Sequence, residues 1–144
     1  MILLLYTTQK GTMTRFVVDS SAVVLLANGG IKVPRKHELL APTLLRSQTL
    51  SVMHEAVQRG EIPAEVALDR LESIWAMKIR LLGDAVLRRR AWAVADQLGW
   101  DSTYNAEYIA LTQLQADAFV TTDMELARGV DGIVATASID ALRS

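Results

Sequence analysis

The sequence predicts an α/β domain in which helices cover both faces of a mainly parallel sheet. Short apolar segments rich in β-branched residues alternate along the chain with longer segments whose apolar residues recur at helical spacing. This alternation of strands and helices is typical of parallel sheets. The chain has 144 residues, which fits one such domain with one core.

The composition is that of a folded globular protein, and it excludes several kinds of site. Hydrophobic residues make up 51% of the chain and charged residues 22%, which are ordinary values. The net charge is −1, from 15 Lys and Arg against 16 Asp and Glu, so nucleic-acid binding would require local positive charge or a metal ion. The sequence has no Cys and two His, which excludes disulfides, thiol nucleophiles and multi-histidine metal sites.

The first twelve residues read MILLLYTTQKGT and precede the first clear strand. Their apolar run is too short to span a membrane or to act as a signal peptide. We therefore expect a domain at 13–144 and an N-terminal extension at 1–12, either an extra edge strand or the product of a mis-assigned start codon. The apolar run Met1–Tyr6 is a candidate partner contact. The expected location is the cytoplasm, without membrane association.

The first strand–helix unit begins with the apolar segment Phe16–Val18. It is predicted to be a buried parallel strand with Asp19 at its carboxyl end. The apolar run Ala22–Ala27 then predicts a helix, which Gly29 and Gly30 end.

The second unit follows a polar loop and begins with the short buried strand Leu39–Ala41. Pro42 and Thr43 open a long helix that runs to about Arg59, since proline is favoured in the first turn of a helix. Another helix is predicted from Pro63, where apolar residues continue at roughly helical spacing.

The third unit is predicted from a short strand at Ile79–Leu82 and a helix that follows it. Asp84 is expected to cap the start of this helix, because its side chain can accept a hydrogen bond from a free backbone N–H. The helix is expected to run to about Leu98 and to end at Gly99.

The remaining elements complete the alternation. A helix is predicted from about Thr103, followed by a strand at Ala118–Thr122 that ends at Asp123. One or two helical turns at Met124–Ala127 and a last strand at Ile133–Ala135 follow.

Two of the predicted strands end in aspartate, at Asp19 and Asp123. In open parallel sheets, ligands bind outside the carboxyl ends of the strands. An isolated Asp after a strand is usually a helix cap, but two carboxylates brought close together repel each other and favour a shared cation. Oxygen ligands without Cys suit Mg²⁺ or Mn²⁺. Metal-assisted phosphodiester hydrolysis is a reaction that such clusters serve.

Four segments of the chain, taken in order, resemble the successive motifs of PIN domains, the VapC ribonuclease toxins in particular. These segments are Phe16–Ala22, Ala41–Leu45, Thr103–Leu111 and Phe119–Leu126. The resemblance implies a three-layer α/β/α sandwich with a mainly parallel sheet, which usually forms a homodimer. It also implies an Mg- or Mn-dependent endoribonuclease that cleaves RNA and is inhibited by a VapB-like antitoxin wrapped around it.

The four acidic residues of that family are matched only in part. The first acid matches Asp19, and the fourth matches Asp123, which Thr121 precedes at the expected distance. The second acid falls on Gln48, and the Asp of the Tyr-Asp-Ala-x-Tyr motif falls on Asn105. Both replacements keep an oxygen ligand and remove a charge. The resemblance thus implies Asp19, Asn105 and Asp123 as catalytic and metal-binding residues, with Gln48 as a supporting hydrogen-bonding residue.

Other polar residues fall close to this set in the sequence. Asp101 precedes Asn105 by four residues and could join the metal ligands, although a role as helix N-cap is favoured. Glu107 is about 200° around the helix from Asn105 and should face away. Ser20 and Arg46 are expected to support the site, Arg46 either by contacting phosphate or by pairing with one of the two aspartates.

Three functions are compatible with these features. The first is a metal-dependent endoribonuclease, and the second is a PIN fold that binds RNA or an antitoxin and cleaves weakly or not at all. The third, a phosphatase with Asp19 as nucleophile, requires a second Asp two residues later, where Ser21 stands. The run Arg88–Arg90 is interpreted as a solvated helix face rather than as an RNA-binding patch.

Overall fold

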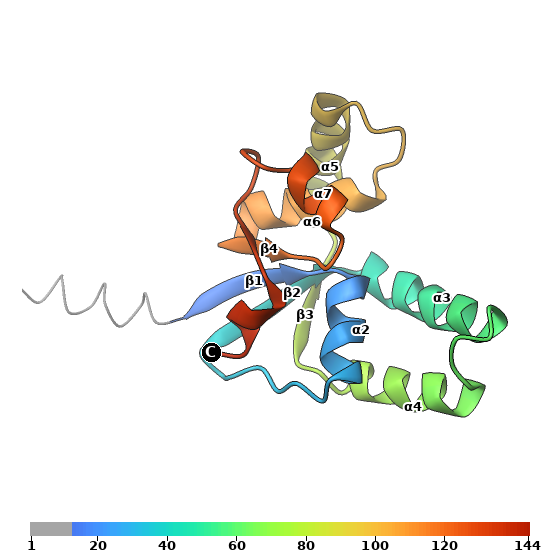
Figure 1. Cartoon of the computed structure of the whole chain (residues 1–144). Coiled ribbons are helices and arrows are strands. Elements are labelled where there is room, and N and C mark those ends of the chain that lie inside the picture. Colours follow the sequence, from blue (N-terminus) through green and yellow to red (C-terminus); the bar gives the residue numbers. More distant parts are fainter. Residues whose placement is uncertain (1–12) are drawn as a thin grey trace, which may run out of the picture.

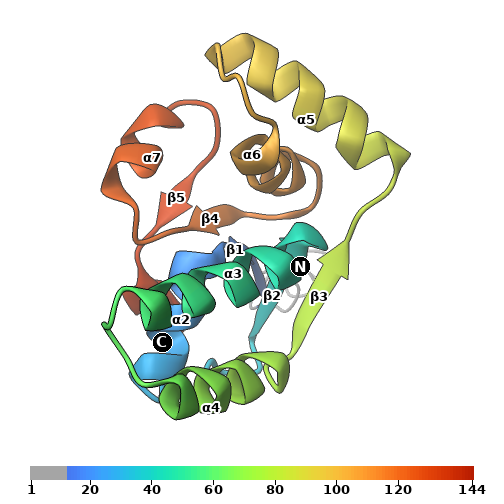
Figure 2. The same ribbon diagram turned by 90° about the vertical axis from the view of Figure 1, so that its right-hand side faces the viewer.

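The computed structural model describes residues 13–144 and shows one five-stranded parallel sheet with helices on both sides (Figures 1 and 2). The strands are β1 (Thr14–Val18), β2 (His37–Pro42), β3 (Ile79–Leu82), β4 (Ala118–Val120) and β5 (Thr136–Ala137). The helices are α2 (Ser20–Asn28), α3 (Leu44–Gln58), α4 (Ala64–Trp75), α5 (Ala85–Leu98), α6 (Tyr104–Gln115), α7 (Met124–Gly129) and the 3₁₀ helix η1 (Ile139–Leu142). The predicted α/β class is confirmed. The predictions for residues 1–12 concern a segment outside the described range.

The strand order is β3-β2-β1-β4-β5, so β1 lies at the centre of the sheet. Helices α2, α3 and α4 lie on one side of the sheet, and α5 and α6 lie on the other (Figure 2). All neighbouring strands are parallel, and Val18 at the end of β1 pairs with Val120 at the end of β4. Asp19 directly follows β1, and Thr121–Asp123 directly follow β4, so these residues lie at the same edge of the sheet.

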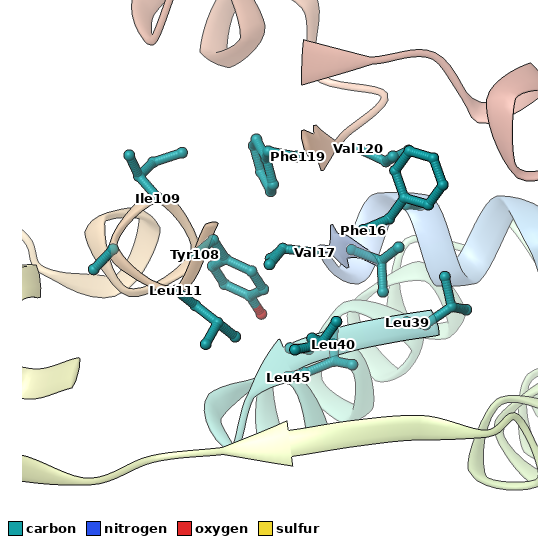
Figure 3. Packing of buried hydrophobic residues seen from close by; sticks show 14 of the residues in the cluster. Phe16, Val17, Leu39, Leu40, Leu45, Tyr108, Ile109, Leu111, Phe119 and Val120 are labelled. Carbon is teal, nitrogen blue, oxygen red and sulfur yellow. The ribbon is translucent and has the colours of Figure 1, made fainter. Parts of the chain in front are cut away.

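Apolar side chains cover both faces of the central strands, because neither face of these strands is exposed to solvent. Val17, Val18 and Phe119 are fully buried. Figure 3 shows Tyr108 pointing from α6 toward β2, and Tyr108, Leu40 and Leu45 belong to the same buried cluster. This packing fixes the distance between α6 and the sheet, which matters for the site described below.

The ends of α5 agree with the sequence prediction. The Asp84 side chain accepts a hydrogen bond from the backbone N–H of Leu87 at 2.9 Å. At the other end, Gly99 adopts a left-handed conformation with φ +68°, which costs glycine little because it has no Cβ. Both predicted helix boundaries are therefore confirmed.

The last strand was predicted at Ile133–Ala135, and this position is wrong. The chain after α7 forms a tight turn in which the Ile133 N–H donates to the Val130 carbonyl at 2.9 Å. The turn includes Gly132 at φ +82°. Sheet bonding begins only at Ala135, whose carbonyl accepts from the Phe119 N–H at 2.9 Å. The strand β5 is therefore displaced toward the carboxyl terminus, to Thr136–Ala137.

The strand β4 is also shorter than predicted and ends at Val120. Thr121 and Thr122 follow the strand and bond to the segment after β1, Thr121 to Asp19 and Thr122 to Ser21.

None of the helices within 13–144 combines the length and apolarity needed to cross a bilayer.

Candidate functional site

Asp19 is the residue around which the carboxyl edge of the sheet is organised. It follows β1 and caps α2, because its Oδ1 accepts a hydrogen bond from the Ala22 N–H at 3.0 Å. The same oxygen accepts from the Ser21 hydroxyl at 2.6 Å. Its Oδ2 accepts from the Thr121 hydroxyl at 2.5 Å. Three donors from two chain segments therefore fix the orientation of this carboxylate.

Thr121 and Ser21 also connect the segment after β1 to the segment after β4. The Thr121 hydroxyl oxygen accepts from the Asp123 N–H at 3.1 Å. The Ser21 hydroxyl oxygen accepts from the Thr122 N–H at 3.0 Å. The two hydroxyl oxygens are themselves 3.3 Å apart. The Thr121 hydroxyl thus joins the carboxylate of Asp19 to the backbone of Asp123.

Asp123 is exposed and caps the short helix α7. Its Oδ1 accepts from the Leu126 N–H at 3.0 Å, whereas its Oδ2 has no hydrogen-bond partner among residues 13–144. A carboxylate has about four acceptor positions, so Asp123 retains most of its capacity to bind a cation. Asp19 has used three positions and retains about one.

Gln48 lies in the first turns of α3, and its side chain is held by Tyr108 of α6. The Tyr108 hydroxyl donates to Gln48 Oε1 at 2.6 Å. Tyr108 is only 1% exposed, and burial raises the pKa of its phenol, with further increases from the negative charges of Asp19 and Glu107. The phenol therefore stays protonated and remains a donor to Gln48.

Asn105 and Asp101 are both exposed, and neither is hydrogen-bonded through its side chain within the part of the chain that the structure describes. The helix α6 begins at Tyr104, whose N–H donates to the Ser102 hydroxyl at 3.2 Å, and Thr103 stands at the N-cap position. The favoured role of Asp101 as N-cap is therefore wrong, because the helix starts later than that role requires.

Glu107 occupies a half-buried position on α6 rather than an open one. Burial raises the pKa of its carboxyl. No hydrogen bond joins the Glu107 side chain to the other site residues over 13–144. That Glu107 faces away from the site stays a prediction.

Over residues 13–144, no three acidic or histidine side chains gather closely enough to hold a metal ion by themselves.

The two supporting residues behave differently from expectation. Ser21, and not Ser20, supplies the hydroxyl that binds Asp19, because the second residue after the cap turns its side chain back toward the carboxylate. Arg46 forms no ion pair with Asp19 or Asp123 in the described chain, so that alternative is wrong. Arg46 instead lines an open cavity of about 280 Å³ together with Trp75. Its contact with phosphate stays a prediction.

The sequence and the structure give different results when they are compared with known proteins. No protein-family model and no curated protein match the sequence. The structure, however, is similar to that of PAE2754 from Pyrobaculum aerophilum, with a TM-score of 0.70 and 22% identity, covering 90% of this chain and 94% of that chain.

Two further solved structures that are similar to this chain are both of VapBC proteins. The structure of VapBC-1 from nontypeable Haemophilus influenzae matches with a TM-score of 0.54 and 11% identity, covering 88% of this chain and 98% of that chain. The structure of VapBC2 from Rickettsia felis, bound to a DNA fragment from their promoter, matches with a TM-score of 0.53 and 12% identity, covering 86% of this chain and 98% of that chain. This chain has the VapC-like PIN fold. At these identities the similarity establishes the fold and not the activity.

The PIN-like fold raises the question whether its acidic edge suits a divalent cation. Mg²⁺ is often held by one or two carboxylates together with substrate phosphates and several water molecules. The unused acceptor positions of Asp123 and Asp19 fit this mode. They do not fit a site built entirely from protein ligands, because Gln48 and Asn105 carry no charge and the Gln48 oxygen already accepts from Tyr108.

Proposed function

We propose that this chain is the VapC-like ribonuclease of a toxin–antitoxin pair and that it cleaves RNA at the edge formed by Asp19, Thr121 and Asp123. One observation carries the proposal: the Thr121 hydroxyl donates to Asp19 at 2.5 Å and accepts from the Asp123 N–H at 3.1 Å. This arrangement supports a common site for two carboxylates at the ligand-binding edge of a parallel sheet.

Mg²⁺ or Mn²⁺ is the cofactor that suits these residues. Asp19 and Asp123 would hold the ion, with Asn105 as a neutral oxygen ligand, and an RNA phosphate would complete its coordination. When bound, such an ion neutralises charge on the phosphate and lowers the pKa of a coordinated water. The protein itself holds the Asp19 carboxylate through Ser21 and Thr121.

A second function, a PIN fold that binds RNA or an antitoxin with little or no cleavage, is favoured by a specific observation. The position where similar proteins carry a second acid is Gln48, and its oxygen accepts a hydrogen bond from the buried Tyr108. A neutral side chain held in this way contributes little to cation binding. The two functions differ in whether a cation binds when RNA is present.

The partners belong to the same proposal. The similarity to VapC chains in two VapBC structures supports a VapB-like antitoxin as the protein partner. RNA is the proposed substrate, and a homodimer is the proposed assembly, as the family resemblance implies.

The experiment restores the two missing charges, with Asn105→Asp and Gln48→Glu combined in one variant. Without metal, the added carboxylates should lower the melting temperature because like charges repel. With Mn²⁺ the variant should gain more stability than the parent, since a charge pair at about 4 Å is worth about 4 kcal/mol at an effective dielectric of about 20, before desolvation. We also expect faster cleavage of single-stranded RNA.

The matched control is Gln58→Glu combined with Gln97→Glu. Both positions are exposed, and the pair adds the same charge at residues that are not part of the candidate site. Thermal unfolding in chelator and in a Mn²⁺ series, together with RNA cleavage, compares the three proteins. A restored variant that behaves like the control, without extra Mn²⁺ stabilisation or cleavage, would refute the ribonuclease proposal and favour the binding function.

A further inference from the structure

The opposite end of the sheet carries a second concave surface, here called the amino-edge groove. It is an open groove of about 1370 Å³, larger than the roughly 300–1,000 Å³ clefts typical of small ligands. It lies at the starts of β2 and β3, next to the carboxyl ends of α2 and α4. The described residues that line it include Ile31, Lys32, Val33, Arg35, Met77 and Lys78.

The rim of the amino-edge groove is strongly positive. Glu38 is the one acidic residue among the described residues of its lining, and this carboxylate is already bonded to Arg15 at 3.1 Å and to Arg80 at 3.4 Å. Lys32, Arg35 and Lys78 are exposed and have no carboxylate partner over 13–144. Three cations with no counter-charge therefore surround one groove in a chain whose net charge is −1.

The negative ends of two helices balance part of the positive charge of Lys32, Arg35 and Lys78 but not all of it. A helix carboxyl terminus carries roughly half a negative charge and attracts cations. The α2 and α4 termini thus offer about one unit of negative charge between them, against three unpaired cations. Residues 1–12 contain one Lys and no acidic residue, so they cannot supply the missing negative charge.

The floor of the groove is aliphatic. Ile31, Val33 and Met77 are half-buried and partly accessible. Proteins that bind single-stranded nucleic acid usually offer aromatic platforms for base stacking. Among the lining residues at 13–144, the aromatic ring is that of His37, which packs edge-on against Phe16 at a centroid distance of 5.1 Å and whose nitrogens are both buried. Such a surface suits apolar side chains flanked by carboxylates better than stacked bases.

We propose that the amino-edge groove binds an acidic, amphipathic segment of a partner protein. Apolar side chains of the segment contact Ile31, Val33 and Met77, and its Asp and Glu residues pair with Lys32, Arg35 and Lys78. The groove lies at the end of the sheet opposite Asp19, so this interaction is separate from the ribonuclease proposal and does not depend on it.

The test selects ligands without assuming their sequence. A library of random 15-residue peptides is selected against the full chain, and fluorescence anisotropy measures the affinity of the enriched peptides. They should be rich in Asp or Glu together with Leu, Ile or Met. The Lys32→Glu and Arg35→Glu double variant should weaken their binding by about tenfold or more, which corresponds to about 1.4 kcal/mol.

The matched control is Arg88→Glu combined with Arg89→Glu, which changes the net charge equally on the exposed face of α5. Circular dichroism verifies that both variants fold. The control should change peptide affinity less than twofold. Enriched peptides without acidic residues, equal losses in both variants, or a single-stranded RNA that binds the groove more tightly than the peptides would each overturn the proposal.

Discussion

At the level of single residues, the Thr121 hydroxyl is the atom group on which the candidate site depends most. It is 7% exposed, donates to Asp19 and accepts from the Asp123 backbone. A buried polar group that loses its partner costs more than the hydrogen bond itself contributes. Thr121 therefore links the stability of the edge to the geometry of both carboxylates.

Replacing Thr121 with Val keeps the shape of the side chain and removes the hydroxyl. We expect a loss of about 1–3 kcal/mol in the free energy of unfolding, because the Asp19 Oδ2 and the Asp123 N–H both lose a partner. Urea unfolding measures the change. Thr121→Ser, which keeps the hydroxyl, should retain more of the stability. Equal stability of the Val and Ser variants would show that the hydroxyl does not join the two segments.

The sequence indicates Asp19, Asp123 and Thr121 but misses Ser21 and Tyr108 as contributors to the site. The bonds of Ser21 to Thr122 and of Tyr108 to Gln48 connect residues 101 and 60 positions apart. Such bonds depend on the register of β1 with β4 and on the depth at which α6 packs. Local sequence patterns carry no information on either quantity.

At the level of elements, prediction succeeds where a boundary is set by local chemistry. The start of α5 follows from the capping side chain of Asp84, and its end follows from Gly99. The prediction fails for β5, because the apolar residues Ile133 and Val134 form a turn in which their N–H groups donate to the Val130 carbonyl. An apolar run therefore predicts burial more reliably than it predicts strand pairing.

Two glycines give an element-level prediction with an internal control. Gly99→Ala should reduce the free energy of unfolding by about 1 kcal/mol, because alanine is strained at φ +68°. Gly129 lies in α7 without positive φ, and an added Cβ there meets nothing within 4 Å. Gly129→Ala should leave stability unchanged or raise it by up to about 1 kcal/mol. Thermal unfolding that ranks the two variants in the reverse order would contradict these helix-end assignments.

At the level of the whole molecule, the two aspartates of the candidate site and the three unpaired cations of the groove lie at opposite ends of the sheet. The carboxyl edge holds Asp19 and Asp123, and the amino-edge groove holds Lys32, Arg35 and Lys78. The net charge of −1 gives no indication that these acidic and basic residues lie at different ends of the sheet. The groove could not be predicted from the sequence, because its cations come from two segments that become neighbours only when β2 and β3 pair.

The central claim is that Asp19 and Asp123 form a cation site that an RNA phosphate completes. The most direct measurement is the affinity of the full chain for a non-cleavable 2′-O-methyl RNA, with chelator and with a Mn²⁺ series. If one ion bridges protein and phosphate, Mn²⁺ should tighten RNA binding, by a factor in the range of about 5–150 that is usual for coupled sites. Asp123→Asn, which keeps a good helix cap and removes the charge, should abolish most of this gain. An RNA affinity that is the same with chelator and with Mn²⁺, or an equal Mn²⁺ effect in the Asp123→Asn variant, would contradict the claim.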